Sequence, residues 1–249
     1  MIIQNRKFAI ALLFVIPFLL ITYGVGSISY GLFPFQQHVV VKKPITLKPL
    51  NQDDSLTEYP YWKDKTTLFL SLHSTAKNLM IGDSIIDAAE WNELFPETSI
   101  LNRGIAGDTA YGVTRRLDSL INTNPDNAFI MLGINDIMNN RKIEKIVKDY
   151  IQILTTLQSN KITPIIQSTL YVSSSFPSYR EKNDAVTQLN TELAEYANKN
   201  DITFVNLNDK LSINETLKSE FTNDGIHLTG AGYQIWKSKI SKYIEAPPH

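Results

Sequence analysis

The stretch Asn78-Leu79-Met80-Ile81-Gly82-Asp83-Ser84 decides the fold of this chain. It starts as a short apolar run of strand length, ends in a Gly-Asp-Ser turn, and leads into a helical stretch near Ile85–Leu94. Similar apolar runs follow at Ile100–Asn102, Ala128–Leu132, Thr163–Gln167 and Thr203–Val205, and helical stretches lie near Ala110–Ile121, Ile143–Leu157, Glu181–Asn198 and Gly230–Ile244. This alternation predicts an α/β domain in which helices cover both faces of a five-stranded parallel sheet.

Three other short polar blocks fall at matching places in this pattern. Gly104-Ile105-Ala106-Gly107-Asp108 follows the second predicted strand, Gly133-Ile134-Asn135-Asp136 follows the third, and Asp224-Gly225-Ile226-His227 immediately precedes the last predicted helix. Ligands of an open α/β sheet bind outside the carboxyl ends of its strands. The blocks after the first three strands are therefore predicted to converge on one edge of the sheet.

The first and last blocks supply a nucleophile and its base. A serine hydroxyl is a poor nucleophile until a base takes its proton, so a histidine is needed. The chain has four histidines, which are His38, His73, His227 and His249. Only His227 has a carboxylate, Asp224, three residues before it in a predicted loop. We therefore predict that Ser84 is the nucleophile, His227 its base, and Asp224 the group that orients the imidazole.

The other two blocks offer donors for an oxyanion. A glycine at Gly107 lets the backbone approach closely, and the amide of Asn135 can donate where an aspartate could not. We predict that the N–H groups of Ser84 and Gly107 and the amide of Asn135 form an oxyanion hole. Each block alone also fits an ordinary turn or helix cap. A catalytic role is favoured because all four blocks occur together, in this order along the chain.

The four blocks resemble those of the SGNH hydrolase (GDSL-like) superfamily, whose name lists a catalytic Ser, Gly, Asn and His. These match Ser84, Gly107, Asn135 and His227 here. The resemblance covers about Tyr61–Ile244 and is nearest to the branch related to the platelet-activating-factor acetylhydrolase catalytic subunit. It implies a flavodoxin-like three-layer sandwich, hydrolysis of esters or thioesters, and no metal or organic cofactor.

Substrate contacts are expected after the fourth predicted strand. Relatives often carry a proline there, where this chain has Thr169-Leu170-Tyr171. The serine-rich segment Val172–Tyr179 follows on the predicted catalytic edge. Tyr171 and Tyr179 are therefore candidate substrate-binding residues, with a purely structural role as the alternative.

Residues 1–33 predict a single-pass membrane segment. Arg6 and Lys7 precede the apolar run Phe8–Ile28, and no Asp, Glu, Lys or Arg occurs between Lys7 and Lys42. A bilayer span needs about 20 apolar residues, so the run is long enough. We favour an uncleaved anchor over a cleaved signal peptide, because no Ala-x-Ala cleavage site is visible. Either reading predicts that the remainder lies outside the cytoplasmic membrane, as a secreted protein if the segment is cleaved.

The remainder is predicted to consist of a tether and one catalytic domain. Residues 34–60 contain four prolines and a polar run without helical periodicity, which is typical of a spacer, and residues 61–249 form the domain. The net charge is −1 and no basic block occurs, so nucleic acid is not an expected partner. The absence of cysteine excludes a thiol nucleophile, a disulfide framework and thiolate metal sites.

Together these features predict a membrane-tethered extracytoplasmic serine esterase that acts through an acyl-enzyme. A small acyl group, acetyl, is expected by analogy with the resembling branch, and an O-acetylated cell-envelope glycan is the expected carrier. A lysophospholipase or lipid esterase and an O-acyltransferase would use the same residues and stay open. A non-catalytic glycan-binding module is the alternative from another class.

Overall fold

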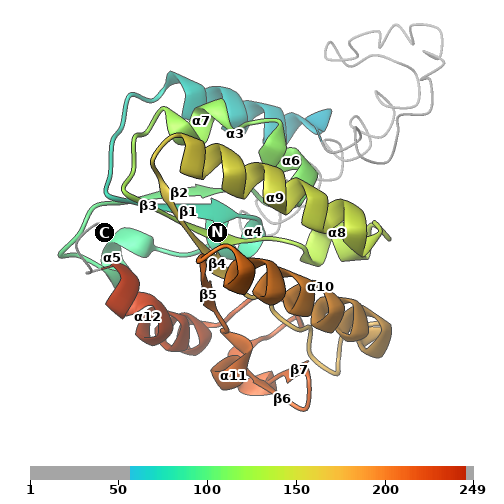
Figure 1. Ribbon diagram of the computed structural model, residues 1–249. Helices are drawn as coiled ribbons and strands as arrows, with labels where there is room; N and C mark the ends of the chain where they lie inside the picture. Colours follow the sequence, from blue (N-terminus) through green and yellow to red (C-terminus); the bar gives the residue numbers. More distant parts are fainter. Residues whose placement is uncertain (1–56, 245–249) are drawn as a thin grey trace, which may run out of the picture. The chain divides into compact units, whose positions relative to one another are not determined.

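The computed structural model describes residues 57–244, which form a parallel sheet between two layers of helices (Figure 1). The strands of the sheet are β1 (Asn78–Gly82), β2 (Ile100–Gly104), β3 (Asn127–Met131), β4 (Thr163–Gln167) and β5 (Thr203–Val205). Their order is β2-β1-β3-β4-β5, and every neighbouring pair is parallel. This is the strand order of the flavodoxin-like fold, so the predicted α/β architecture is confirmed.

Helices connect the strands and cover the sheet. They are α3 (Pro60–Ser71), α4 (Ser84–Asp87), α5 (Trp91–Leu94), α6 (Ala110–Thr114), α7 (Asp118–Ile121), α8 (Ile134–Met138), α9 (Ile143–Ser159), α10 (Tyr179–Lys199), α11 (Asn208–Leu211) and α12 (Gly230–Ile244). A small antiparallel hairpin of β6 (Ser212–Ile213) and β7 (Thr216–Leu217) follows α11. Of the helices in residues 57–244, none combines the length and the apolar character that crossing a bilayer requires. The predicted anchor and most of the predicted tether lie outside the described residues.

Alternate side chains of the strands build two separate cores. On β1, Leu79 and Ile81 face the layer of α6, α7, α9 and α10, whereas Met80 faces α4, α5, α11 and α12. All three side chains are fully buried. Strands that are covered on both faces carry nearly continuous apolar runs, and this property made them recognisable in the sequence.

Helix α3 was not predicted from the sequence. It begins at Pro60, the last residue of the predicted tether, and proline is well suited to a first helical turn. Its buried side chains Trp62 and Phe69 form a small apolar cluster with Ile105, which directly follows β2. Leu68 in the same helix is half exposed. Because apolar residues lie on both its buried and exposed sides, α3 lacks the clean helical period that would have revealed it.

The single helix predicted near Ile85–Leu94 is wrong, because the chain forms the two short helices α4 and α5 there. The amide Nδ2 of Asn102, on β2, donates to the carbonyl oxygens of Ile86, Asp87 and Ala89 at 2.9, 3.1 and 3.2 Å. Carbonyl groups at a helix end need partners outside the helix, and this one side chain provides them. The helix therefore ends where β2 lies against it.

The helix predicted over Ala110–Ile121 is likewise divided, into α6 and α7. The guanidinium of Arg116, between them, donates to the Asp108 carboxylate at 2.8 Å and to the carbonyl oxygen of Arg103 at 2.8 Å. The backbone N–H groups of Arg115 and Arg116 bond to carbonyls three residues earlier. This tightened turn draws Arg116 inward and interrupts the helix.

Candidate active site

Three side chains from distant parts of the chain meet beyond the carboxyl end of β1. The hydroxyl Oγ of Ser84, at the start of α4, lies 2.9 Å from Nε2 of His227. The other ring nitrogen, Nδ1, lies 2.6 Å from Oδ2 of Asp224. The structure therefore brings the predicted nucleophile, base and orienting carboxylate into one hydrogen-bonded series. Such a series can activate a serine hydroxyl for attack on a carbonyl carbon.

Close packing at the β1–α4 turn holds Ser84 in place. A Cβ added to Gly82 would lie 2.6 Å from the carbonyl oxygen of Met131, so no side chain fits there. Asp83 caps α4 by accepting a hydrogen bond from the N–H of Ile85 at 3.0 Å. The Gly-Asp-Ser turn is thus required by the local structure, and it also presents the hydroxyl.

The loop before α12 positions both oxygens of Asp224. Oδ1 accepts from the N–H groups of Ile226 and His227 at 3.0 and 2.8 Å, which leaves Oδ2 for the imidazole. Gly225 has a φ of 90°, which favours glycine, and its N–H donates to Thr222 Oγ1 at 3.0 Å. Burial acts to raise the pKa of Asp224, but the hydrogen bonds from the His227 ring and these N–H groups outweigh it and lower the pKa. The group is a carboxylate at neutral pH.

Gly107 lies in a β-turn directly after β2. The N–H of Asp108 donates to the carbonyl oxygen of Ile105 at 3.0 Å, and φ of Gly107 is 81°. That value at the third position is typical of a type II turn and favours glycine. Within residues 57–244, the N–H groups of Gly107 and Ser84 donate to no protein acceptor. Both N–H groups are therefore available to a ligand.

Asn135 lies in the first turn of α8, after β3. A side-chain amide has two N–H donors, and one of them bonds the carbonyl oxygen of Asp108 at 2.9 Å. This bond joins the turn after β3 to the turn that contains Gly107. The amide is thereby oriented with one donor remaining, as an oxyanion site requires.

Asp108 ties the Gly107 turn to α3, and sequence reasoning missed this connection. Its Oδ1 accepts from Nε1 of Trp62 in α3 at 3.0 Å, and its Oδ2 accepts from Nε of Arg116 at 2.8 Å. Asp108 and Arg116 are fully buried as an ion pair. Trp62 lies 46 residues before Asp108, so no local pattern could mark the contact. Asp108 therefore acts on the site through the position of its own backbone.

Two more aspartates are buried beneath the site. Burial raises the pKa of Asp83 to about 7 and that of Asp136 to about 7. Asp136 accepts from the N–H of Ala110 at 3.0 Å and from Nη1 of Arg141 at 3.1 Å. The bond from Ala110 connects α8 to the start of α6, and the bond from Arg141 connects α8 to the segment between α8 and α9. The carboxyl groups therefore hold the loops around the site in place.

The two predicted substrate-binding tyrosines do not hydrogen-bond to the series of Ser84, His227 and Asp224. The hydroxyl of Tyr171 lies 2.9 Å from Thr187 Oγ1 on α10. Tyr179 begins α10 and is half-buried beneath the guanidinium of Arg180, 4.9 Å from the ring centroid. Among the described residues, no three His, Asp or Glu side chains are close enough to hold a metal ion.

Known proteins show similarity over most of the described region. The model of the GDSL-like lipase/acylhydrolase family matches residues 80–235. The N-acylneuraminate cytidylyltransferase of Streptococcus agalactiae serotype V is 24% identical over 146 residues, or 58% of this chain. The chain spans only 34% of the length of that relative.

Two further similarities extend over most of the compared protein. The platelet-activating factor acetylhydrolase IB subunit alpha2 of Homo sapiens is 30% identical over 168 residues, which cover 62% of this chain and 70% of the relative. The solved structure of a GDSL-like lipase from Bacteroides thetaiotaomicron has a TM-score of 0.65 and 29% identity. That match covers 74% of this chain and 97% of the lipase.

Proposed function

Since this chain belongs to the GDSL-like lipase/acylhydrolase family, we propose that it hydrolyses ester bonds as a serine esterase with Ser84 as its nucleophile. One observation carries the proposal. Ser84 Oγ lies 2.9 Å from His227 Nε2, and His227 Nδ1 lies 2.6 Å from Asp224 Oδ2. Both distances are short enough for a proton to pass from the hydroxyl to the ring while the carboxylate stabilises the resulting imidazolium.

The proposed reaction has two halves. Ser84 Oγ attacks the carbonyl carbon, and its proton moves to Nε2 of His227. The tetrahedral intermediate collapses, the alcohol leaves with the proton from the imidazolium, and the acyl group stays on Ser84 as an ester. Water then attacks this ester with His227 again as base, and the acid is released with the serine regenerated.

The N–H groups of Ser84 and Gly107 and the remaining amide donor of Asn135 are proposed to bind the oxyanion of each intermediate. Two observations support this assignment. Both backbone N–H groups lack protein acceptors in the described region, and the Asn135 amide is oriented by its bond to Asp108. Donors that are fixed before the reaction stabilise the developing negative charge without having to reorganise.

We expect Asn135→Ala to lower kcat by about 100- to 1000-fold with little change in KM, because the donor binds the intermediate more strongly than the substrate. The assay is initial-rate hydrolysis of p-nitrophenyl acetate by the purified full chain. Asn139→Ala, at the end of the same helix, is the matched control and should retain wild-type kinetics. An unchanged kcat in Asn135→Ala would remove this side chain from the oxyanion site.

The proposed substrate is an ester of a small acyl group, acetyl, carried by a cell-envelope glycan. Support for acetyl comes from the similarity to a protein named as an acetylhydrolase. The test compares kcat/KM for p-nitrophenyl acetate and p-nitrophenyl palmitate, with heat-denatured protein as background. A preference of at least tenfold for acetate is expected. A preference for palmitate would contradict the small-acyl proposal and favour a lipid ester.

We also propose that residues 1–33 anchor the enzyme in the cytoplasmic membrane and that residues 34–60 hold the domain of residues 61–249 outside it. The support is the uncharged stretch between Lys7 and Lys42. The protein is expected to stay with membranes after carbonate extraction and to be degraded by protease added to intact spheroplasts. Recovery in the soluble fraction, or protection from the protease, would contradict the anchored extracytoplasmic arrangement.

Trp62→Phe should lower kcat by about tenfold while KM stays within twofold. The change keeps an aromatic ring but removes the N–H that bonds Asp108, so the neighbouring Gly107 and Asn135 donors are held less firmly. Trp236→Phe is the matched control, since it removes a buried bond to Gln167 in the opposite core. Both variants should lose some thermal stability, but only Trp62→Phe should lose kcat. An equal kcat for the two variants would refute a positioning role for Trp62.

A further inference from the structure

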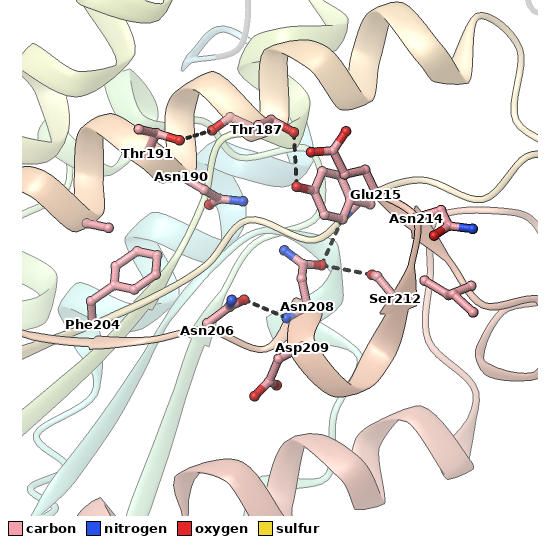
Figure 2. A pocket seen from close by; sticks show the side chains of 13 residues that line it. Thr187, Asn190, Thr191, Phe204, Asn206, Asn208, Asp209, Ser212, Asn214 and Glu215 are labelled. Atoms are coloured by element: carbon pink, nitrogen blue, oxygen red, sulfur yellow. Dashed lines mark hydrogen bonds between the residues drawn. The ribbon is translucent and has the colours of Figure 1, made fainter.

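A groove lies at the β5 edge of the sheet, apart from the catalytic contacts. It has a volume of about 400 Å³ and lies between α10, β5 and the segment from α11 to β7 (Figure 2). This volume is within the range of roughly 300–1,000 Å³ that is typical of small-molecule sites. Because β5 is an outer strand of the sheet, no strand within residues 57–244 pairs with its free edge. Ser84, Asp224 and His227 are not among the residues that line the groove.

Two aromatic side chains line the groove. Phe204 comes from β5 and Tyr171 from the segment after β4, and both are half-buried. The hydroxyl of Tyr171 and Oγ1 of Thr187 are 2.9 Å apart, so the ring is tied to α10. An aromatic face packs well against a flat ligand that has C–H groups on one side and polar groups at its rim.

Polar groups without protein partners lie around these rings. Asn206 accepts a hydrogen bond from the N–H of Asn208 at 3.0 Å, but its amide nitrogen has no acceptor within residues 57–244. The side chains of Asn214 and Glu215, in the turn between β6 and β7, also make no hydrogen bond to the described residues. Amides and carboxylates together offer donors and acceptors to neighbouring hydroxyl groups of a ligand.

Two other asparagines form the walls and already make hydrogen bonds to the protein backbone. Asn190 on α10 accepts from the N–H of Thr169 at 2.8 Å and donates to its carbonyl oxygen at 2.9 Å. Asn208 donates to the same carbonyl at 2.8 Å and accepts from the N–H of Tyr171. These bonds fix the backbone beside Tyr171 before any ligand binds, which lowers the entropic cost of binding.

The charge of the groove selects among ligands. Of the residues that the structure describes, no lysine or arginine lines it, whereas two carboxylates do. Asp209 is paired with Lys239 at 2.7 Å, and Glu215 has no cationic partner in the described part of the chain. A phosphate or carboxylate ligand would meet uncompensated negative charge, so a neutral polyhydroxylated ligand suits the groove better.

One short segment connects this groove to the catalytic loop. The carbonyl oxygen of Val172, next to Tyr171, accepts from the N–H of Leu217 in β7 at 3.3 Å. The N–H of Ser173 donates to the carbonyl oxygen of Gly225 at 2.8 Å, beside Asp224. The groove and the catalytic loop therefore flank the same three-residue segment.

We propose that this groove is a subsite for a neutral oligosaccharide, which binds the sugar chain of the substrate while an ester on that chain reaches Ser84. The inference rests on the proposed esterase function and names its substrate as a polymeric rather than a small sugar ester. Phe204 and Tyr171 supply the ring faces, and Asn206, Asn214 and Glu215 supply hydrogen bonds to hydroxyl groups.

Binding is tested first, by titration calorimetry of the full chain with chitotetraose. The wild-type protein is expected to bind chitotetraose. It is not expected to bind tetragalacturonate, which has the same length but carries carboxylates. Asn206→Ala, at an exposed position, and Phe204→Ala should weaken binding by roughly tenfold. Gln188→Ala is the matched control, because it removes an amide from α10 outside the groove. Absence of chitotetraose binding, or equal binding by all variants, would refute the subsite.

Kinetics then separate failure of the subsite from failure of the esterase. We expect kcat/KM for partially O-acetylated chitotetraose to exceed that for O-acetylated N-acetylglucosamine, and Asn206→Ala to reduce this ratio by roughly tenfold, through KM. A ratio that is unchanged in Asn206→Ala would refute the subsite even with a fully active enzyme. Chitotetraose binding by a protein that hydrolyses neither ester would refute the esterase proposal but would still support the oligosaccharide site.

Discussion

Ser84→Ala is expected to lower kcat for p-nitrophenyl acetate by about 10⁴- to 10⁶-fold. The reason is that no other hydroxyl in residues 57–244 is hydrogen-bonded to His227, so the covalent route through an acyl-enzyme is lost. The residual rate should come from the oxyanion donors, which still stabilise the intermediate formed when water attacks the ester directly. The measurement is a steady-state rate with enough enzyme to detect turnover near the uncatalysed background.

The same variant should fold normally. Among the described residues Ser84 Oγ bonds only to the His227 ring, so its loss leaves the cap of α4 by Asp83 and both cores intact. Thermal melting should therefore shift by only a few degrees. Ser238→Ala, on the exposed face of α12, is the matched control and should keep full activity. An unfolded Ser84→Ala protein would indicate that the serine is structural, and an active one would exclude it as the nucleophile.

Asp224→Asn is expected to lower kcat by about 10³- to 10⁴-fold. An asparagine can keep the backbone hydrogen bonds through its oxygen, but it then presents an N–H to His227 Nδ1 in place of a carboxylate oxygen. The ring would have to carry its proton on Nε2, and it could no longer accept the proton of Ser84. The position of the imidazole is retained, but the ring is held in the tautomer that cannot accept the proton of Ser84.

The lowered pKa of Asp224 also determines the pH range in which this carboxylate stabilises the fold. Its hydrogen bonds lower the pKa, so the wild-type carboxylate stays ionised as the pH falls through the mildly acidic range. The stability it contributes is present above the unfolded-state pKa and is lost only as the pH falls through the lowered folded-state value. Asp184→Asn, on the exposed side of α10, is the matched control and should retain wild-type activity. A near-normal rate for Asp224→Asn would show that the backbone alone orients the imidazole.

The sheet could be predicted from the sequence because its strands are buried on both sides and so appear as short apolar runs. Helix boundaries were less accessible, for reasons that depend on tertiary contacts. The break after α4 depends on the side chain of Asn102, which reaches across from β2. Helix α3 buries only the stripe of Trp62, Phe69 and Thr66, and no periodic pattern follows from that.

The parts of the candidate site were predictable to different degrees. Ser84, Asp224 and His227 lie in short motifs whose residue types indicate their chemistry. The strand pattern places the Ser84 motif at the edge of the sheet, whereas Asp224 and His227 were assigned from their spacing and chemistry. Trp62 carries no such signal, because its contact with Asp108 exists only in the folded chain. Tyr171 was predicted as a substrate contact because of its position after β4, and the structure places it in the β5 groove.

The contact between Ser84 and His227 also sets a time at which activity can begin. The two residues are 143 positions apart, so the nucleophile leaves the ribosome long before its base does. At a synthesis rate of about 5–20 residues per second, the interval is roughly 7–30 seconds. During that interval the nascent chain holds the serine without the group that activates it. The nascent polypeptide is therefore inactive at first, and its acylating activity can begin only after His227 has been synthesised and has folded against Ser84.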